Sequence, residues 1–254
     1  MRRPICLLFI SFIVLQASCQ ASAEQPLDGE PIPELVLAFT KTTGFRHKSI
    51  EKGVQTLREL GRENGFIVLQ TESSEDFNEE NLKNYKLIVF LNTTMDVLDT
   101  GQQQAFENYI RAGGSFMGVH AATDTEYDWA WYGRLVGAYF DGHPNTPNIR
   151  EAKMDVLTKE HPATAHLKDE WVRNDEWYNF KNLNPDVTVL INLDETSYEG
   201  GTNGERHPIA WCHEFDGGRA FYTGGGHTDA SFDEPDFRKH LLGGILWCFD
   251  RSDD

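Results

Sequence analysis

Blocks of apolar and polar residues alternate along the first half of the chain in a way that predicts strands and helices in turn. Short apolar runs, typical of buried strands, occupy residues 34–39, 66–70, 86–92 and 115–119. An amphipathic helix is predicted between the first two, because apolar residues recur every three or four positions at Ile50, Val54, Leu57 and Leu60. A short polar helix from about residue 79 and a longer one over residues 100–112 separate the later strands. This alternation predicts an α/β fold with a parallel sheet.

The second half of the chain shows shorter strands and fewer helices. Helices are predicted over residues 129–139 and 236–249. Strands are expected at residues 152–157, 171–180 and 187–193, then as a hairpin-like pair at 208–215 and 219–223. The sequence therefore predicts a three-layer sandwich with a mainly parallel sheet and a mixed extension, in one domain over residues 34–250. An acidic tail over residues 251–254 follows it.

The N-terminal segment has the features of a secretory signal peptide over residues 1–23. Arg2 and Arg3 precede an apolar run over residues 5–15. That run is too short for a permanent anchor, which needs about 20 residues. Ala21-Ser22-Ala23 predicts cleavage before Glu24, so that residues 24–33 form a linker.

The signal predicts export to the periplasm or the extracellular space, with no membrane span in the mature chain. Anchoring through a lipid on Cys19 is the alternative, because small residues precede this cysteine. Gln16, however, stands where a lipoprotein signal has an aliphatic residue.

Composition narrows the classes of partner. The 254 residues include 40 Asp and Glu against 23 Lys and Arg, which gives a net charge of −17. Such a charge repels phosphate backbones and anionic lipids, so nucleic-acid binding is not expected. The partner should be a neutral, cationic or small molecule. Cys212 and Cys248 lie in apolar segments and are expected as buried thiols rather than a disulfide.

Candidate chemistry collects at the predicted strand ends. His120 directly follows the strand at residues 115–119, and His227 follows three glycines after the strand at 219–223. Asp175 and Glu176 are adjacent on another strand, so only one of them can face a given pocket. A structural role for each histidine and a solvated pair of acids are the alternatives. We expect the side chains of His120, His227 and at least one of the two acids within about 10 Å of a common centre.

No short-range metal motif is present: the sequence has no H-E-x-x-H, no C-x-x-C pair and no calcium loop. No cofactor is required by the sequence. A site for a divalent metal such as zinc remains an alternative, because distant loops can supply the ligands His120, His143, His227 and Glu176. Residues 40–47 contain a single glycine, which disfavours a nucleotide phosphate loop.

Several ordered motifs resemble one known family. They are TGFRH at residues 43–47, GVHAATD at 118–124, WY at 131–132, LVGAYF at 135–140, GHP at 142–144, DE at 175–176, HPIAW at 207–211, GR at 218–219, YT at 222–223 and GH at 226–227. Together they resemble the ThuA-like trehalose-utilization family over residues 34–250. The resemblance implies a flavodoxin-like fold similar to class I glutamine amidotransferases. It also implies a role in the use of disaccharides, notably through 3-keto sugars, with a small carbohydrate as the partner.

The same resemblance excludes glutamine hydrolysis, because His120 stands where amidotransferases carry their nucleophilic cysteine. Acid–base chemistry remains, with His120 and either Glu176 or Asp175 moving a proton and His227 orienting the substrate. A carbohydrate-binding protein without catalysis and a metal-dependent hydrolase are the alternatives. The sugar, the bond and the oligomeric state stay open. Further substrate contacts are expected from Arg46, His47, Thr123, Asp124, His143, Tyr178, Trp211 and Tyr222.

Overall fold

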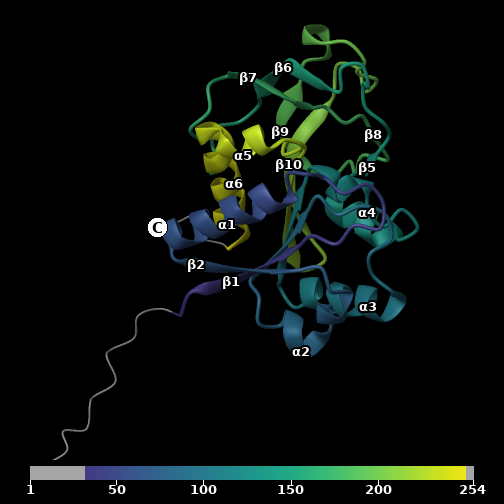
Figure 1. The fold of residues 1–254 in the computed structure, drawn as a ribbon, viewed down its shortest axis with the longest axis vertical. Coiled ribbons are helices and arrows are strands. Elements are labelled where there is room, and N and C mark those ends of the chain that lie inside the picture. The colour runs from purple at the N-terminus through teal and green to yellow at the C-terminus, as the bar shows by residue number, and fades with distance from the viewer. Residues whose placement is uncertain (1–31, 250–254) are drawn as a thin grey trace, which may run out of the picture. The chain divides into compact units, whose positions relative to one another are not determined.

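The structure is a computed structural model that describes residues 32–249 (Figure 1). The predicted signal peptide, its cleavage site, Cys19 and the acidic tail lie outside these residues. Within residues 32–249, no helix combines the length and the apolar character needed to cross a membrane.

The first half of the described chain forms parallel strands, as predicted. The strands are β1 (Glu34–Phe39), β2 (Phe66–Thr71), β3 (Leu87–Leu91) and β4 (Ser115–Val119). They lie in the order β2-β1-β3-β4, and each neighbouring pair is parallel. Flavodoxin-like sheets have this order, in which all carboxyl ends reach the same edge.

The second half extends the sheet with antiparallel strands, in the order β4-β11-β10-β9-β6-β7. The added strands are β6 (Ile149–Val156), β7 (Glu170–Glu176), β9 (Thr188–Leu193), β10 (Pro208–Phe215) and β11 (Gly218–Thr223). Only β11 continues the parallel part, by pairing with β4. The expectation of a mainly parallel sheet is therefore wrong, and the sheet is mixed. The tight turn between β10 and β11 is too short for the crossover that parallel neighbours require.

The predicted strand over residues 171–180 is shorter than expected and divides. It ends as β7 at Glu176, and Phe180–Lys181 forms β8, which pairs with β5 (Tyr139–Phe140) in a separate two-stranded sheet. The break between β7 and β8 matters for function because it places Glu176 at a strand end.

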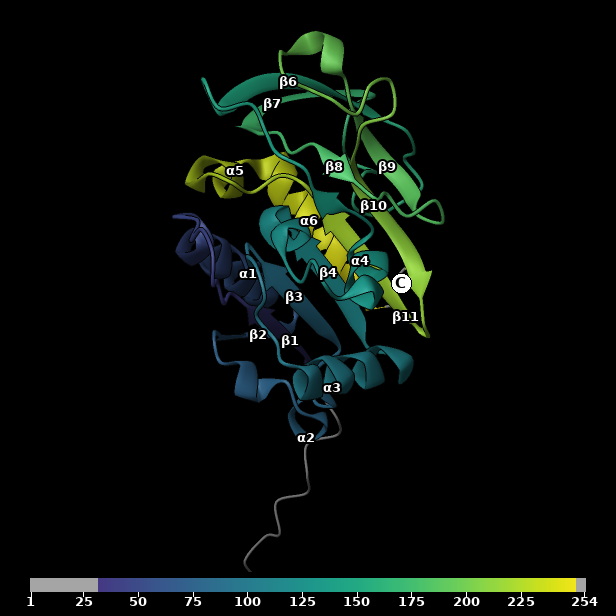
Figure 2. The same ribbon diagram turned by 90° about the vertical axis from the view of Figure 1, so that its right-hand side faces the viewer.

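Helices cover both faces of the sheet (Figures 1 and 2). The first face carries α1 (Ile50–Asn64), α5 (Asp229–Asp233) and α6 (Pro235–Cys248). The second face carries α2 (Glu79–Leu82), α3 (Thr100–Arg111) and α4 (Ala130–Val136). A capping box between Asp99 and Gln102 fixes the start of α3, and Gly65 ends α1 in the left-handed conformation.

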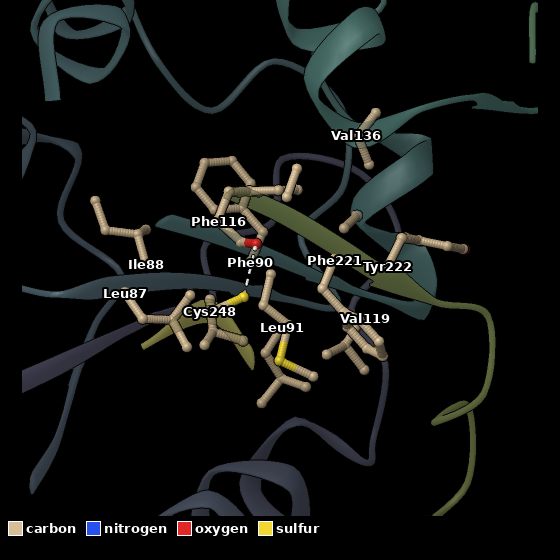
Figure 3. Close-up of a cluster of buried hydrophobic side chains, with 14 of the residues drawn as sticks. Leu87, Ile88, Phe90, Leu91, Phe116, Val119, Val136, Phe221, Tyr222 and Cys248 are labelled. Carbon is tan, nitrogen blue, oxygen red and sulfur yellow. Dashed lines mark hydrogen bonds between the residues drawn. The ribbon is translucent and has the colours of Figure 1, made fainter. Parts of the chain in front are cut away.

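The core lies between the sheet and these helices, and Figure 3 shows a part of it in which Phe90, Phe116 and Phe221 lie among aliphatic side chains and Cys248. The Phe90 ring lies 5.2 Å from that of Phe39, 5.5 Å from Phe106 and 5.4 Å from Phe116, between centroids. Cys248 is buried with its sulfur 3.7 Å from the Phe116 carbonyl oxygen, and Cys212 is also a buried free thiol, as predicted. This packing makes the sheet a rigid base for the loops at its edge.

His240 of α6 makes the stability of this core dependent on pH. Its Nδ1–H donates to the Ala163 carbonyl at 2.9 Å, and burial lowers its pKa from 6.5 to about 3. Between these pH values the His240 imidazole is protonated in the unfolded state and neutral in the folded state. The free energy of unfolding therefore decreases as pH falls through that window.

We expect His240→Gln to flatten the pH dependence of the unfolding free energy between pH 6 and pH 4 by about 1.4 kcal/mol per pH unit. Urea unfolding at several pH values measures this slope. Asn174→Gln, a change at an exposed uncharged residue, is the control and should keep the wild-type slope. Equal slopes in wild type and His240→Gln would contradict the assignment.

Candidate functional site

His120 stands in a tight turn at the carboxyl end of β4. It begins the 3₁₀ turn His120–Asp124 with a φ of 47°, a left-handed conformation that is unfavourable for a residue with a side chain. The Tyr222 hydroxyl donates to the His120 carbonyl oxygen at 2.8 Å and holds this turn. The His120 Nδ1 lies 2.9 Å from the Gly224 carbonyl oxygen, to which it can only donate. The Nε2 of a neutral His120 is therefore an acceptor, and it can donate to a carboxylate only when the imidazole carries a second proton.

His227 approaches that Nε2 from the loop after β11, which neighbours β4 in the sheet. Its Nδ1 lies 3.2 Å from the His120 Nε2. The glycines before it allow a close backbone approach, since a Cβ on Gly225 would lie 2.3 Å from an Arg173 nitrogen. Gly226 has a φ of 114°, which strongly favours glycine.

Glu176 completes this centre from the end of β7. Its Oε2 lies 2.9 Å from the His227 Nδ1 and 3.4 Å from the His120 Nε2, while Asn148 donates to its Oε1 at 3.0 Å. Burial raises the pKa of Glu176, but hydrogen bonds from His120 and His227 outweigh it and hold this pKa well below its usual range. The carboxylate is therefore ionised at neutral pH.

His47, on the loop between β1 and α1, is the fourth member. Its ring centroid lies 5.0 Å from those of both His120 and His227. Burial, followed by the two neighbouring imidazoles, lowers its pKa from 6.5 to about 2, so it is neutral. Its buried Nδ1 has no hydrogen-bond partner. A neutral imidazole with an unpaired nitrogen has the protonation state that a metal ligand needs.

The four side chains each bring one ligand atom to within 4.8 Å of the others. Among His120, Glu176 and His227 the separations are 2.9, 3.2 and 3.4 Å. Tetrahedral zinc with bonds of 2.0–2.2 Å requires separations of about 3.4 Å between its ligands. The His120 Nδ1 bond to a carbonyl is also the support that ligating histidines have. The residues present therefore fit a divalent metal ion.

His143 was expected as a substrate contact and as an optional metal ligand, and His47 only as a substrate contact. The structure places His47 in the centre and His143 beside it. The His143 Nδ1 lies 2.9 Å from the Pro144 carbonyl oxygen and 3.5 Å from the Glu176 Oε1. His143 lines the wall of the pocket beside the centre.

Asp175 faces away from the pocket, which corrects its assignment as a catalytic residue. Its buried carboxylate accepts hydrogen bonds from the backbone N–H groups of Gly226 at 2.8 Å and His227 at 3.1 Å. It also accepts from Ser231 at 2.9 Å and pairs with Arg173 at 3.1 Å. Asp175 is therefore a positioning residue that fixes the loop carrying His227.

The centre opens into a pocket of about 340 Å³. Tyr178 forms part of the wall, with its ring centroid 4.2 Å from that of His120. Asp124 brings a second carboxyl group, whose pKa burial raises although the Tyr127 hydroxyl bonds to it. The pocket is lined by Phe45, His47, Asp124, Phe140, His143, Asn148, Glu176, Tyr178 and His227.

Four expected substrate contacts lie away from this pocket. Trp211 and Tyr222 are buried and stack on each other at 4.2 Å between centroids, so their rings belong to the core. Thr123 is buried as well, 3.2 Å from the Tyr222 hydroxyl. Arg46 forms ion pairs with Glu51 and Glu72 on the outside of its loop. These residues were expected as substrate contacts because they lie near the site histidines in sequence. Nearness in sequence does not determine the direction in which a side chain points.

Three site residues were not found from sequence. Phe45 and Asn148 line the pocket. Asn92, at the end of β3, donates to the Ser49 hydroxyl at 3.1 Å and to the Gly226 carbonyl at 3.2 Å, and so links two of the histidine loops. The position of Asn92 directly after an apolar strand was a signal that sequence reasoning could have used. For Phe45 and Asn148 the sequence offers no such signal of their own, only their nearness to other site residues.

Comparison with known proteins identifies the family. A model of the family described as ThuA, trehalose utilisation, matches residues 35–248. The chain belongs to this family. No curated protein matches the chain.

Solved structures show the same fold. A ThuA-like protein from Bacteroides uniformis is 24% identical with a TM-score of 0.73, and the match covers 88% of this chain and 95% of that one. A ThuA-like protein from Parabacteroides merdae is 19% identical with a TM-score of 0.69, covering 85% and 90%. A β-galactosidase from Bacillus circulans matches at 11% identity and a TM-score of 0.54, over 87% of this chain and 32% of that chain. Identities this low show the fold alone.

We expect Asp175→Asn to lower the free energy of unfolding by about 3–5 kcal/mol, because it leaves the buried Arg173 without its buried carboxylate. Urea unfolding measures the change. Glu234→Gln is the matched control: this carboxylate also pairs with Arg173 at 2.9 Å but is partly exposed, so its loss should cost about 1 kcal/mol or less. A loss below about 0.5 kcal/mol in Asp175→Asn would show that the carboxylate does not hold the loop.

Proposed function

We propose that this protein is a sugar-processing enzyme with a divalent metal, zinc in the first instance, held by His47, His120, Glu176 and His227. The observation that carries the proposal is the convergence of three imidazoles and one ionised carboxylate at the base of a pocket. Membership of a trehalose-utilisation family supports a carbohydrate as the substrate. A disaccharide or its 3-keto derivative is the substrate class that we propose.

The charges of the centre support the metal. A metal ion requires its histidine ligands in the neutral form, so the four ligands together would bring one negative charge, and a divalent cation would leave the centre with a net charge of +1. Such an ion, when bound, would have to take a substrate oxygen as a fifth ligand; it would then polarise that oxygen and stabilise the negative charge that develops on it. His120 and Glu176, which the sequence analysis assigned to proton transfer, become ligands in this proposal.

Proton transfer then falls to Asp124 and His143, which line the pocket beside the centre. Burial raises the pKa of Asp124, which makes its carboxylate a stronger base. In a 3-keto sugar, the C–H bond beside the carbonyl is acidic enough for such a base to take its proton. The electron pair of that bond then moves toward the carbonyl oxygen, and a positive charge near this oxygen stabilises the negative charge that develops on it.

Acid–base chemistry without a metal at the same centre is the second candidate. The 2.9 Å contact between the His227 Nδ1 and the Glu176 Oε2 favours it, since a hydrogen-bonded imidazole–carboxylate pair can itself move a proton. In that case His120 and Glu176 act directly, and metal removal leaves activity intact.

Metal analysis and turnover separate the two candidates. We expect about one zinc ion per chain in the reconstituted wild type, and loss of both zinc and turnover in Glu176→Gln. Asp124→Asn should retain zinc while turnover of a 3-keto disaccharide falls about 10²–10⁴-fold. Asp128→Asn, at an exposed acid four residues away, is the matched control and should resemble wild type.

Full activity in chelator-treated, zinc-free protein would contradict the metal proposal and favour the second candidate. Binding of sugar without turnover in every metal state would instead make the chain a carbohydrate-binding protein.

We also propose that the protein is exported, on the basis of the charged and apolar pattern before Ala21-Ser22-Ala23. Mass spectrometry of the native protein should find Glu24 as the first residue. A lipid-modified Cys19 as the first residue would support the anchored alternative, and an intact N-terminus would contradict export by this signal.

A further inference from the structure

Phe45 is an exposed aromatic residue at the mouth of the pocket. Its side chain is 65% exposed, and it is the one aromatic among the exposed large apolar residues in the described part of the chain. The ring lines the pocket and lies 4.9 Å from the ring of His47, nearly perpendicular to it at 84°. A large apolar ring that is exposed to water beside a polar centre is a surface against which a ligand can pack.

The backbone that carries Phe45 is held in place. Thr94 donates from its hydroxyl to the Phe45 carbonyl at 3.0 Å and accepts from the Gly44 N–H at 3.2 Å. A further backbone bond joins the Thr43 N–H to the Thr94 carbonyl at 3.1 Å. These bonds hold the loop in place before a ligand arrives, so the loop loses little conformational entropy on binding.

The charge of the pocket restricts what can lie against this ring. Among the described residues that line the pocket, Asp124 and Glu176 are acidic and none is a lysine or an arginine. Nearby Arg46 is paired with Glu51 and Glu72, outside the lining. With the proposed ion bound, Glu176 is one of its ligands and is neutralised there. A phosphate group on the part of the sugar away from the ion would then meet the Asp124 carboxyl group and no fixed side-chain cation. Hydroxyl groups, in contrast, can bond to Asp124, Asn148 and His143.

We propose that the Phe45 ring is the platform on which one ring of an unphosphorylated, uncharged sugar lies while its hydroxyl groups bond to the pocket wall. This inference rests on the proposed sugar-processing function and adds to it the class of sugar and the residue that selects it. Sugar rings have an apolar face of C–H groups, which an aromatic ring covers. The volume of about 340 Å³ lies at the small end for ligand pockets, as expected for a site that takes a small sugar.

Isothermal titration calorimetry with the zinc-loaded mature chain tests the proposal, with trehalose and trehalose 6-phosphate as a matched pair of probes. We expect trehalose to bind at least about tenfold more tightly than its phosphate. Phe45→Ala should weaken trehalose binding roughly tenfold, which corresponds to burial of about half of a phenylalanine side chain. Phe45→Tyr should stay close to wild type because it keeps the ring.

Leu157→Ala, a change at an exposed apolar residue outside the pocket lining, is the matched control and should bind as wild type does. Zinc content is measured in every sample and should be unchanged by Phe45→Ala. Wild-type affinity in Phe45→Ala, or equal binding of the phosphorylated sugar, would overturn the inference and leave the sugar-processing function standing. Failure of the wild type to bind either sugar, together with no turnover of a 3-keto disaccharide, would overturn both.

Discussion

The site depends on one buried carboxylate that makes no contact with the pocket. Asp175 accepts hydrogen bonds from the backbone of Gly226 and His227 and from Ser231, which lies 56 residues away in sequence, while it pairs with the buried Arg173. The neighbouring Glu176 points the opposite way, as alternation along a strand requires, and reaches the histidines. Two adjacent acids thus divide the work: one holds the loop that carries His227 and the other bonds to His227. The strand β7 is anchored to the site on both of its faces.

The mixed sheet explains how β7 reaches a centre built at the ends of β4 and β11. These two strands are parallel neighbours, so His120 and His227 meet at one edge. β7 lies at the far end of the strand order, separated from β11 by three antiparallel strands. Figure 2 shows β6 and β7 lying across the end of the sheet above α5 and α6. The accumulated twist of the antiparallel part therefore returns Glu176 to the parallel part. The two halves of the sheet have distinct roles: one presents the histidines, and the other closes the centre over them.

Most of the correct predictions from sequence came from the periodicity of apolar residues and from the residues that directly follow predicted strands. The parallel order of the first four strands is confirmed, and so is the approach of His120, His227 and one acid. Alternation showed that Asp175 and Glu176 point opposite ways but not which one faces the pocket, since that depends on where β7 ends and how β6 pairs with it. His47 was expected only as a substrate contact, and His143 was kept as an optional metal ligand, because loop residues have no periodicity that gives the direction of a side chain. Trp211 and Tyr222 look like sugar contacts in sequence, yet their strands are buried on both faces. Phe45 carried no pattern, because exposure at a pocket mouth is a tertiary property.

The central claim is that the four side chains form a metal site, and a crystal structure of zinc-loaded protein with anomalous data at the zinc edge tests it most directly. The account predicts one anomalous peak bonded to the His120 Nε2, the His227 Nδ1, a Glu176 oxygen and His47, with bonds of about 2.0–2.2 Å. The contradicting result is a structure without a peak among these side chains at saturating zinc, in which the Glu176 carboxylate remains hydrogen-bonded to the two imidazoles.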